Sequence, residues 1–104
     1  MHLTRVLDIL KDPDGNPARG KIYIHNPAFI TADETPIAAG VLNYIIPEQN
    51  PGLVDLLLAP TEGAEPEETC YTVDYFLQSG AQYRETWCVP RNGPITISQA
   101  RNTA

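Results

Sequence analysis

The chain has 104 residues, 42% of them hydrophobic, which fits one domain that can form its own core. Its formal net charge of −6 argues against nucleic acid as a partner, because nucleic-acid binders usually carry a basic surface that neutralises phosphates. The first fifteen residues hold too few consecutive apolar positions for a signal peptide or a membrane span, so no membrane partner is expected.

The N-terminal part is expected to form two strands separated by a turn. "DPDG", residues 12–15, carries Asp, Pro and Gly at the positions that a type I turn favours. The apolar spacing of Leu3–Leu10 fits a strand or a helix, and we favour the strand because a hairpin with the next segment would follow. In that segment, "GKIYIH", Ile22 and Ile24 alternate with polar-side residues that include Tyr23, which predicts a half-buried strand.

The middle of the chain is expected to alternate between loops and extended segments. Residues 26–36 are interpreted as a loop, and residues 37–47 as a third extended segment whose facing cannot be assigned. Leu53–Ala59 is predicted to be a fourth strand, and residues 60–68 an acidic surface loop. The predicted inward residues of the fourth strand are Val54, Leu56 and Leu58.

Residues 69–89 predict a hairpin whose bulky side chains share one face. Antiparallel partners point to the same side of a sheet, so odd-numbered residues must face odd-numbered residues. A register in which Tyr71 faces Trp87 leaves "QSG" as the loop and puts Gly80 where a left-handed residue is needed. The register also makes three favourable pairs: Tyr75 with Tyr83, Asp74 with Arg84, and Thr72 with Thr86. We therefore expect the aromatic residues Tyr71, Tyr75, Tyr83 and Trp87 to lie in the core.

The same register turns Glu85 inward, opposite Val73, where an unpaired carboxylate would be costly. Three explanations stay open. Glu85 lies at the sheet margin, a bulge changes the parity, or the carboxylate has a partner that the sequence does not identify.

Cys70 and Cys88 also face each other in this register. The preferred interpretation is a pair of reduced, half-buried thiols, and the alternative is a cross-strand disulfide. A catalytic or redox role is not favoured, because there is no CxxC motif and no local His or cation to lower a thiol pKa. A zinc site would need more ligands than these cysteines and the distant His2 and His25.

No catalytic, cofactor-binding or metal-binding residues are predicted elsewhere. "DPDGN" resembles part of a calcium loop, but its Gly comes one position early and the closing Glu is missing. The acidic loop is interpreted as a solvated connection, and no nucleophile–base set or phosphate-binding Gly loop is present. We therefore expect a protein that is not an enzyme and needs no cofactor. Tyr23 is the candidate contact residue on a strand, and Arg101, in the arm "ISQARNTA", is a second candidate.

About seven strands separated by turns predict an all-β fold, an antiparallel β-sandwich of the immunoglobulin type. Residues 1–104 are expected to form one such domain, with "PITI" as a short final strand and residues 99–104 as a C-terminal tail.

Several motifs resemble the prealbumin-like or carboxypeptidase-regulatory-like sandwiches of tailed-bacteriophage virion proteins. They are a D-x-x-G-x-P-x-x-G entry at residues 12–20, a Leu-rich strand ending in Pro60, a Y-x-V-x-Y strand at 71–75, and "VP" before "PITI". The resemblance implies a non-enzymatic tail, neck, fibre-attachment or capsid-decoration subunit that assembles in the host cytoplasm. Its implied partners are other virion proteins and copies of itself, as a homo-oligomer in the particle.

Two other classes are weighed against this one. The closing signature and catalytic histidines of transthyretin-like hydrolases do not occur, so such an enzyme is not expected. An extracellular adhesion or carbohydrate-binding sandwich is the alternative function, with Tyr23 as its contact residue.

Overall fold

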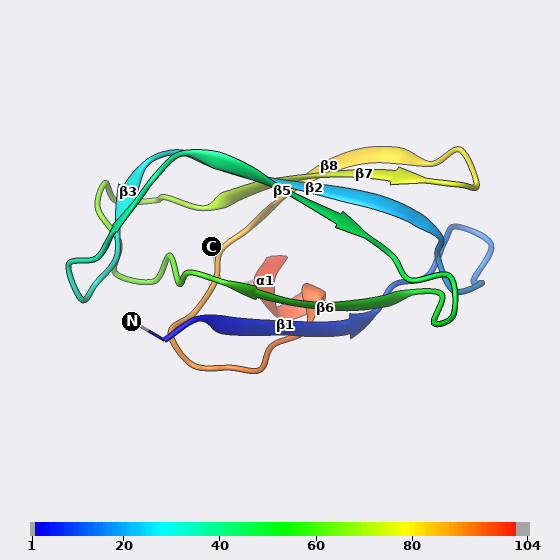
Figure 1. Cartoon of the computed structure of the whole chain (residues 1–104), viewed down its shortest axis with the longest axis horizontal. Coiled ribbons are helices and arrows are strands. Elements are labelled where there is room, and N and C mark those ends of the chain that lie inside the picture. Colours follow the sequence, from blue (N-terminus) through cyan, green and yellow to red (C-terminus); the bar gives the residue numbers. More distant parts are fainter. Residues whose placement is uncertain (1, 102–104) are drawn as a thin grey trace.

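The computed structural model describes residues 2–101 and confirms an all-β, antiparallel fold (Figure 1). In chain order the elements are β1 (Thr4–Ile9), β2 (Gly20–Asn26), β3 (Phe29–Ile30), β4 (Pro36–Ile37), β5 (Gly40–Ile45), β6 (Leu53–Leu58), β7 (Tyr71–Leu77), β8 (Gln82–Trp87) and α1 (Ile97–Arg101). One sheet has the strand order β5-β2-β7-β8, a second pairs β1 with β6, and β3 pairs with β4.

The four-stranded sheet and the β1–β6 pair pack as two layers over one core (Figure 1). Alternation along each strand sends every second side chain inward, so the apolar parity of each strand meets that of the opposite layer. The predicted inward residues of β6 are all buried. The larger sheet contributes Ile22, Ile24, Val73, Tyr75 and Trp87 to the core, and the smaller one contributes Val6, Val54, Leu56 and Leu58.

The predicted first hairpin is wrong, although its turn is correct. The Gly15 N–H donates to the Asp12 carbonyl at 2.9 Å, and the Asp12 carboxylate accepts the N–H groups of Asp14 and Asn16. β1 is a strand, as predicted, but it pairs with β6, whereas β2 pairs with β5 and β7. The turn therefore carries the chain from one layer to the other. β1 and β2 lie in different sheets, and each turns its apolar side chains toward the core between the layers.

The predicted loop at residues 26–36 contains a short strand. β3 pairs with β4, and Phe29 is buried with its ring edge-on to Tyr71, at 6.2 Å between centroids. The predicted third segment is divided at residues 38–39, so that only β5 joins the larger sheet. β5 is an edge strand in which every residue except Tyr44 is exposed, which is why no inward face could be assigned.

The C-terminal prediction is also corrected. The segment "PITI" supplies only one bridge, between Ile95 and Val6, and the chain then turns into α1. Thr96 and Gln99 form a capping box, since each backbone N–H donates to the other residue's side chain, at 2.8 and 3.2 Å. Residues 99–101 therefore belong to a docked helix with Ala100 buried, and residues 102–104 of the expected tail lie outside the described residues.

Gly20 is expected to be essential for the pairing of β2 with β7. Its φ is +132°, and a Cβ there would lie 2.3 Å from the Phe76 carbonyl oxygen. Gly20→Ala should lower the free energy of unfolding by about 2–4 kcal/mol in urea denaturation. Gly40→Ala is the matched control, because a Cβ on Gly40 meets no atom within 4 Å, and it should change stability by less than about 0.5 kcal/mol. Equal effects of the two changes would contradict this account.

Candidate functional site

The β7–β8 hairpin has the predicted register. Tyr71 faces Trp87 and Asp74 faces Arg84, and Gly80 has a φ of +95° in the connecting turn. Tyr71, Tyr75 and Trp87 are buried, as predicted. Tyr83 corrects the prediction, because it is 40% exposed. Its ring stacks on Tyr75 at 4.3 Å, and its other face is open since β8 is the last strand of the sheet.

The Cys70 and Cys88 sulfurs are joined in a disulfide, which is the second of the two alternatives drawn from the sequence. Their Cα atoms lie 4.7 Å apart, directly beyond the paired ends of β7 and β8. The Cys88 N–H donates to the Ala100 carbonyl at 3.0 Å. The cross-linked end of the hairpin therefore also holds α1.

Two of the three explanations for the inward position of Glu85 hold, because β8 is the last strand of its sheet and the carboxylate also has partners. Glu85 lies opposite Val73 without a bulge, and its carboxylate accepts the Tyr75 hydroxyl and, at 3.0 Å, the Trp87 indole N–H. The Arg101 guanidinium donates to both carboxylate oxygens, through Nε and through Nη2. We call Tyr75, Glu85, Trp87 and Arg101 the Glu85 cluster. Arg101 was predicted to contact a partner protein, but its guanidinium forms an ion pair with Glu85 of the same chain.

The charge of the Glu85 cluster is fixed by its hydrogen bonds. Burial opposes ionisation of Glu85, but the bonds from Arg101, Tyr75 and Trp87 outweigh it and hold the pKa of the carboxyl below its usual range. Burial and the neighbouring carboxylate raise the pKa of the Tyr75 phenol. Glu85 is therefore an ion at neutral pH, held by the Arg101 cation and by the Tyr75 and Trp87 donors, and it links α1 to β8.

Tyr23 lies on the outer face of the four-stranded sheet. Its ring packs edge-on to Phe76 at 5.2 Å, and the Lys21 ammonium lies 5.5 Å from the ring centroid. The ring is half-buried between these neighbours. Tyr23 is thus a partly accessible aromatic residue on an open sheet face.

An ion cluster lies next to Tyr23 on the same face. Arg84 donates to both oxygens of Asp74, at 2.7 and 3.2 Å, and His25 Nε2 lies 3.1 Å from Asp74 Oδ2. The hydrogen bond from Arg84 is the main cause that lowers the pKa of Asp74. This carboxylate, like that of Glu85, is held by an arginine.

A hollow of about 680 Å³ lies beside the disulfide, which forms part of its wall. Val89 and Pro90 add apolar surface, and Glu62, Glu67 and Glu68 stand at the rim. The loop at residues 60–68 carries its glutamates outward as predicted, but Thr61 and Ala64 in it are buried.

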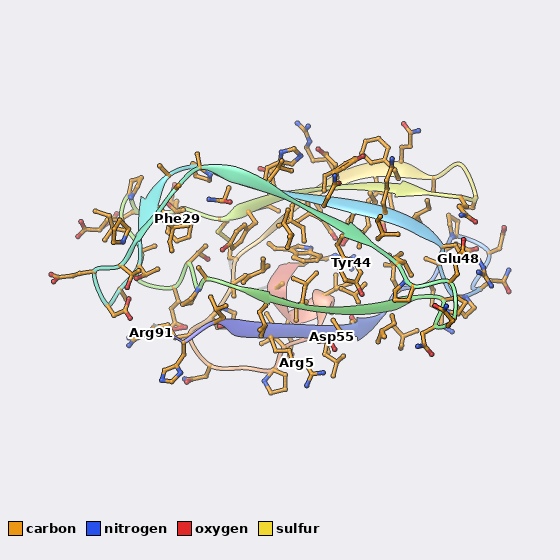
Figure 2. All side chains as sticks on the ribbon, in the orientation of Figure 1. Arg5, Phe29, Tyr44, Glu48, Asp55 and Arg91 are labelled. Atoms are coloured by element: carbon orange, nitrogen blue, oxygen red, sulfur yellow. A yellow bond between two sulfur atoms is a disulfide. The ribbon has the colours of Figure 1, made fainter. Side chains whose placement is uncertain are left out.

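The outer face of β1 and β6 carries an apolar surface that the sequence reasoning missed. Arg5 and Asp55 form a two-bond ion pair there, with both N–O distances 2.8 Å, on the side away from the larger sheet (Figure 2). Large aliphatic residues surround this pair, and we call them the β1–β6 apolar face: Leu3, Leu7, Ile9 and Leu57. The signal was present, because both strands have apolar residues at odd and at even positions.

Within residues 2–101, no group of three or more His, Cys, Asp or Glu side chains is arranged to hold a metal ion. No helix in this part of the chain is long and apolar enough to cross a membrane. The sequence matches no family model, and no curated protein or solved structure matches it. The resemblance to virion sandwich domains therefore remains a prediction from motifs.

The disulfide is expected to contribute substantially to stability, because it closes a loop with a sequence separation of 18. Reduction, or the double change Cys70→Ser and Cys88→Ser, should lower the free energy of unfolding by about 3 kcal/mol. Urea denaturation with and without reductant measures the difference. The double variant is the control for reductant effects, and a midpoint in that variant equal to the oxidised wild type would contradict the prediction.

The Arg101–Glu85 ion pair predicts a pH-dependent effect of substitution. Arg101→Met should destabilise the fold by about 1–2 kcal/mol at pH 7, since it leaves a half-buried carboxylate without its cation. The folded-state pKa of Glu85 is lowered, so its contribution is present above the unfolded value of about 4.3 and is lost as pH falls through the folded value. The difference between wild type and variant should therefore shrink between pH 7 and pH 3.

Urea denaturation at both pH values tests this prediction. Arg19→Met is the matched control, because within residues 2–101 the exposed Arg19 side chain makes a single long hydrogen bond, at 3.5 Å to the Glu48 carbonyl, and its loss should have little effect at either pH. A difference for Arg101→Met that stays constant with pH would show that lost packing, and not charge, causes the destabilisation.

Proposed function

We propose that this chain is a non-enzymatic structural subunit of a tailed-phage virion that acts through protein–protein assembly. The observation that carries the proposal is the β1–β6 apolar face. Four large aliphatic side chains, each between 37% and 56% exposed, lie together on a two-stranded sheet that no other layer covers on that side. Large aliphatic side chains that gather on one exposed face of a sheet are a common feature of protein–protein contact surfaces.

The chemistry of the face favours a protein surface as its partner. Arg5 and Asp55 satisfy each other at its centre, so they bring no net charge into an interface. Charged residues are depleted in the core of protein interfaces, and a pair whose charges cancel costs less there than a lone charge while it fixes the orientation of the partners. The virion as the setting, in the tail, neck, fibre-attachment or decoration position, comes from the motif resemblance, as does assembly in the host cytoplasm.

The state of the carboxylates supports a role without catalysis. Asp55, Asp74 and Glu85 each lie against an arginine that lowers the pKa of the carboxyl, although burial acts against this shift in all three and most strongly at Glu85. A general acid at neutral pH needs the opposite shift. The neighbours of these groups therefore stabilise fixed charges.

A carbohydrate-binding or adhesion module is the second candidate, and Tyr23 is the observation that favours it. Tyr23 and Phe76 form an aromatic pair on an exposed sheet face beside the polar groups of Asp74 and Arg84. We rank this function second because the Tyr23 ring is half-buried, which leaves less of it for stacking on a sugar.

Replacement of Leu57 should separate assembly from folding. Leu57 is 56% exposed, so Leu57→Lys should leave stability within about 0.5 kcal/mol of wild type, whereas a buried lysine in the contact should reduce incorporation into particles about tenfold or more. The measurement is mass spectrometry of purified particles assembled with either chain, with cryo-electron microscopy to locate the subunit. Gln78→Lys, at an exposed turn position, adds the same charge elsewhere and should incorporate normally.

Two results would overturn the proposal. One is absence of the wild-type chain from particles. The other is glycan-array binding that disappears with Tyr23→Ala while Leu57→Lys incorporates normally, which would favour the adhesion module.

A further inference from the structure

β5 is an unprotected edge of the four-stranded sheet. The strand order leaves β2 as its only neighbour, and Val41, Leu42 and Ile45 are 58%, 42% and 72% exposed. Edge strands of soluble proteins usually carry a charge, a proline or a bulge that discourages further pairing. Gly40–Ile45, "GVLNYI", has no charged residue and no proline, and it pairs with β2 without interruption.

The backbone of β5 has a row of groups that face outward. The Ile46 N–H donates to the Gly20 carbonyl at 3.0 Å, so the even-numbered residues of this segment direct their N–H and C=O groups to β2. Alternation along an antiparallel ladder then directs those of Val41, Asn43 and Ile45 to the free edge. These three residues offer donors and acceptors in the spacing of a further strand.

The C-terminal segment covers the β1–β8 side of the sandwich and leaves the β5 side accessible. On the opposite side, the Leu7 N–H donates to the Ile95 carbonyl at 2.9 Å, and α1 is attached beside β8 through the Cys88–Ala100 bond. On the β5 side, Tyr44 spans the two layers, with its hydroxyl donating to the Leu53 carbonyl at 2.8 Å (Figure 2). β5 and the free edge of β6 thus lie on one side of the molecule.

We propose that β5 pairs with β5 of a second copy of this chain, antiparallel, about a two-fold axis at Asn43. In this register Asn43 faces its counterpart and Val41 faces Ile45, so every outward backbone group finds a partner, in about six hydrogen bonds. A shift of the centre to Leu42 or Tyr44 leaves one of the three residues unpaired. The sequence of β5 is therefore complementary to itself at one register.

Side chains and charges also favour a second copy as the occupant. On the outer face, Val41 lies against Ile45 on both sides of the Asn43 amide pair, and on the inner face Leu42 lies against Tyr44. The nearest carboxylate, Glu48, comes opposite Ala38, so two chains of net charge −6 meet here without opposing like charges. A basic strand from another protein would find no complementary charge on β5.

The proposed β5–β5 contact buries little surface, so its affinity is low. A six-residue strand pair lies below the roughly 1,200 Å² that stable interfaces bury, so we expect a weak dimer that forms only at high concentration. This inference rests on the proposed assembly function, because weak two-fold contacts become effective when many copies are held in one particle.

Sedimentation equilibrium over a range of concentrations tests the dimer. Wild type should shift from 11.5 kDa toward roughly 23 kDa between about 1 μM and 1 mM. Asn43→Pro should remain monomeric yet folded by circular dichroism, because its N–H points to the free edge and is not used in the fold. Ile45→Lys, at a 72% exposed position, is a second monomeric variant that does not alter the backbone. Gln78→Lys, at an exposed turn position outside both proposed contact surfaces, is the control and should dimerise as wild type does.

Single cysteines test the register under mild oxidation, with the native disulfide retained. Asn43→Cys should cross-link to itself, because opposed Cα atoms in a hydrogen-bonded pair lie about 5.5 Å apart. Val41→Cys alone should not, since its two copies would lie about 14 Å apart, but a mixture of Val41→Cys and Ile45→Cys should cross-link. Ser79→Cys, at an exposed turn position outside both proposed contact surfaces, is the control for random collision.

A wild-type chain that stays monomeric at 1 mM, or an Asn43→Pro variant that still dimerises, would overturn the proposal, as would cross-linking of Val41→Cys with itself. These measurements are independent of the assembly test. A dimer in a chain that is absent from particles would remove the virion function alone, and normal incorporation of a strictly monomeric chain would remove the β5 contact alone.

Discussion

The register of the β7–β8 hairpin is the constraint on which the rest of the structure depends. Once Tyr71 faces Trp87, the large rings of both strands lie on one side, and Tyr75 and Trp87 fill the centre of the core with no exposed surface. The same choice sets Cys70 beside Cys88 and brings Glu85 to the inner face. Packing of the aromatic rings therefore determines where a charge must be accommodated.

The need to neutralise the Glu85 carboxylate accounts for the position of α1 and of the segment that leads into it. A carboxylate between Tyr75 and Trp87 needs a cation, and Arg101 supplies it only if α1 docks beside β8. The segment that leads into α1 lies along β1, where Ile95 completes the backbone bonds of that edge. One side of the sandwich is thus covered by the C-terminal segment, and the side of β5 and β6 remains open (Figure 1).

Local patterns predicted the local structure well, and contacts between distant segments were not predictable. The hairpin register followed from parity and turn chemistry within twenty residues, and the inward face of β6 followed from alternation. The β1–β2 hairpin was wrong because a turn specifies a reversal of direction, not whether the strands pair or separate into two layers. The partner of Glu85 could not be named, since the position of Arg101 depends on a helix. The capping box of Thr96 and Gln99 was the available signal for that helix, and "PITI" read as a strand obscured it.

The two open surfaces are suited to different kinds of contact. The β1–β6 apolar face points away from the larger sheet and gains its energy from burial, so its partner must match its shape around the Arg5–Asp55 pair. The β5 edge points sideways and gains its energy from backbone hydrogen bonds, which depend on register more than on side-chain shape. Because the two surfaces face in different directions, the proposed partner and the proposed second copy would not compete for the same part of the chain. An isologous dimer or a module with one partner needs only one such surface, whereas a larger assembly in which each copy meets several neighbours needs at least two.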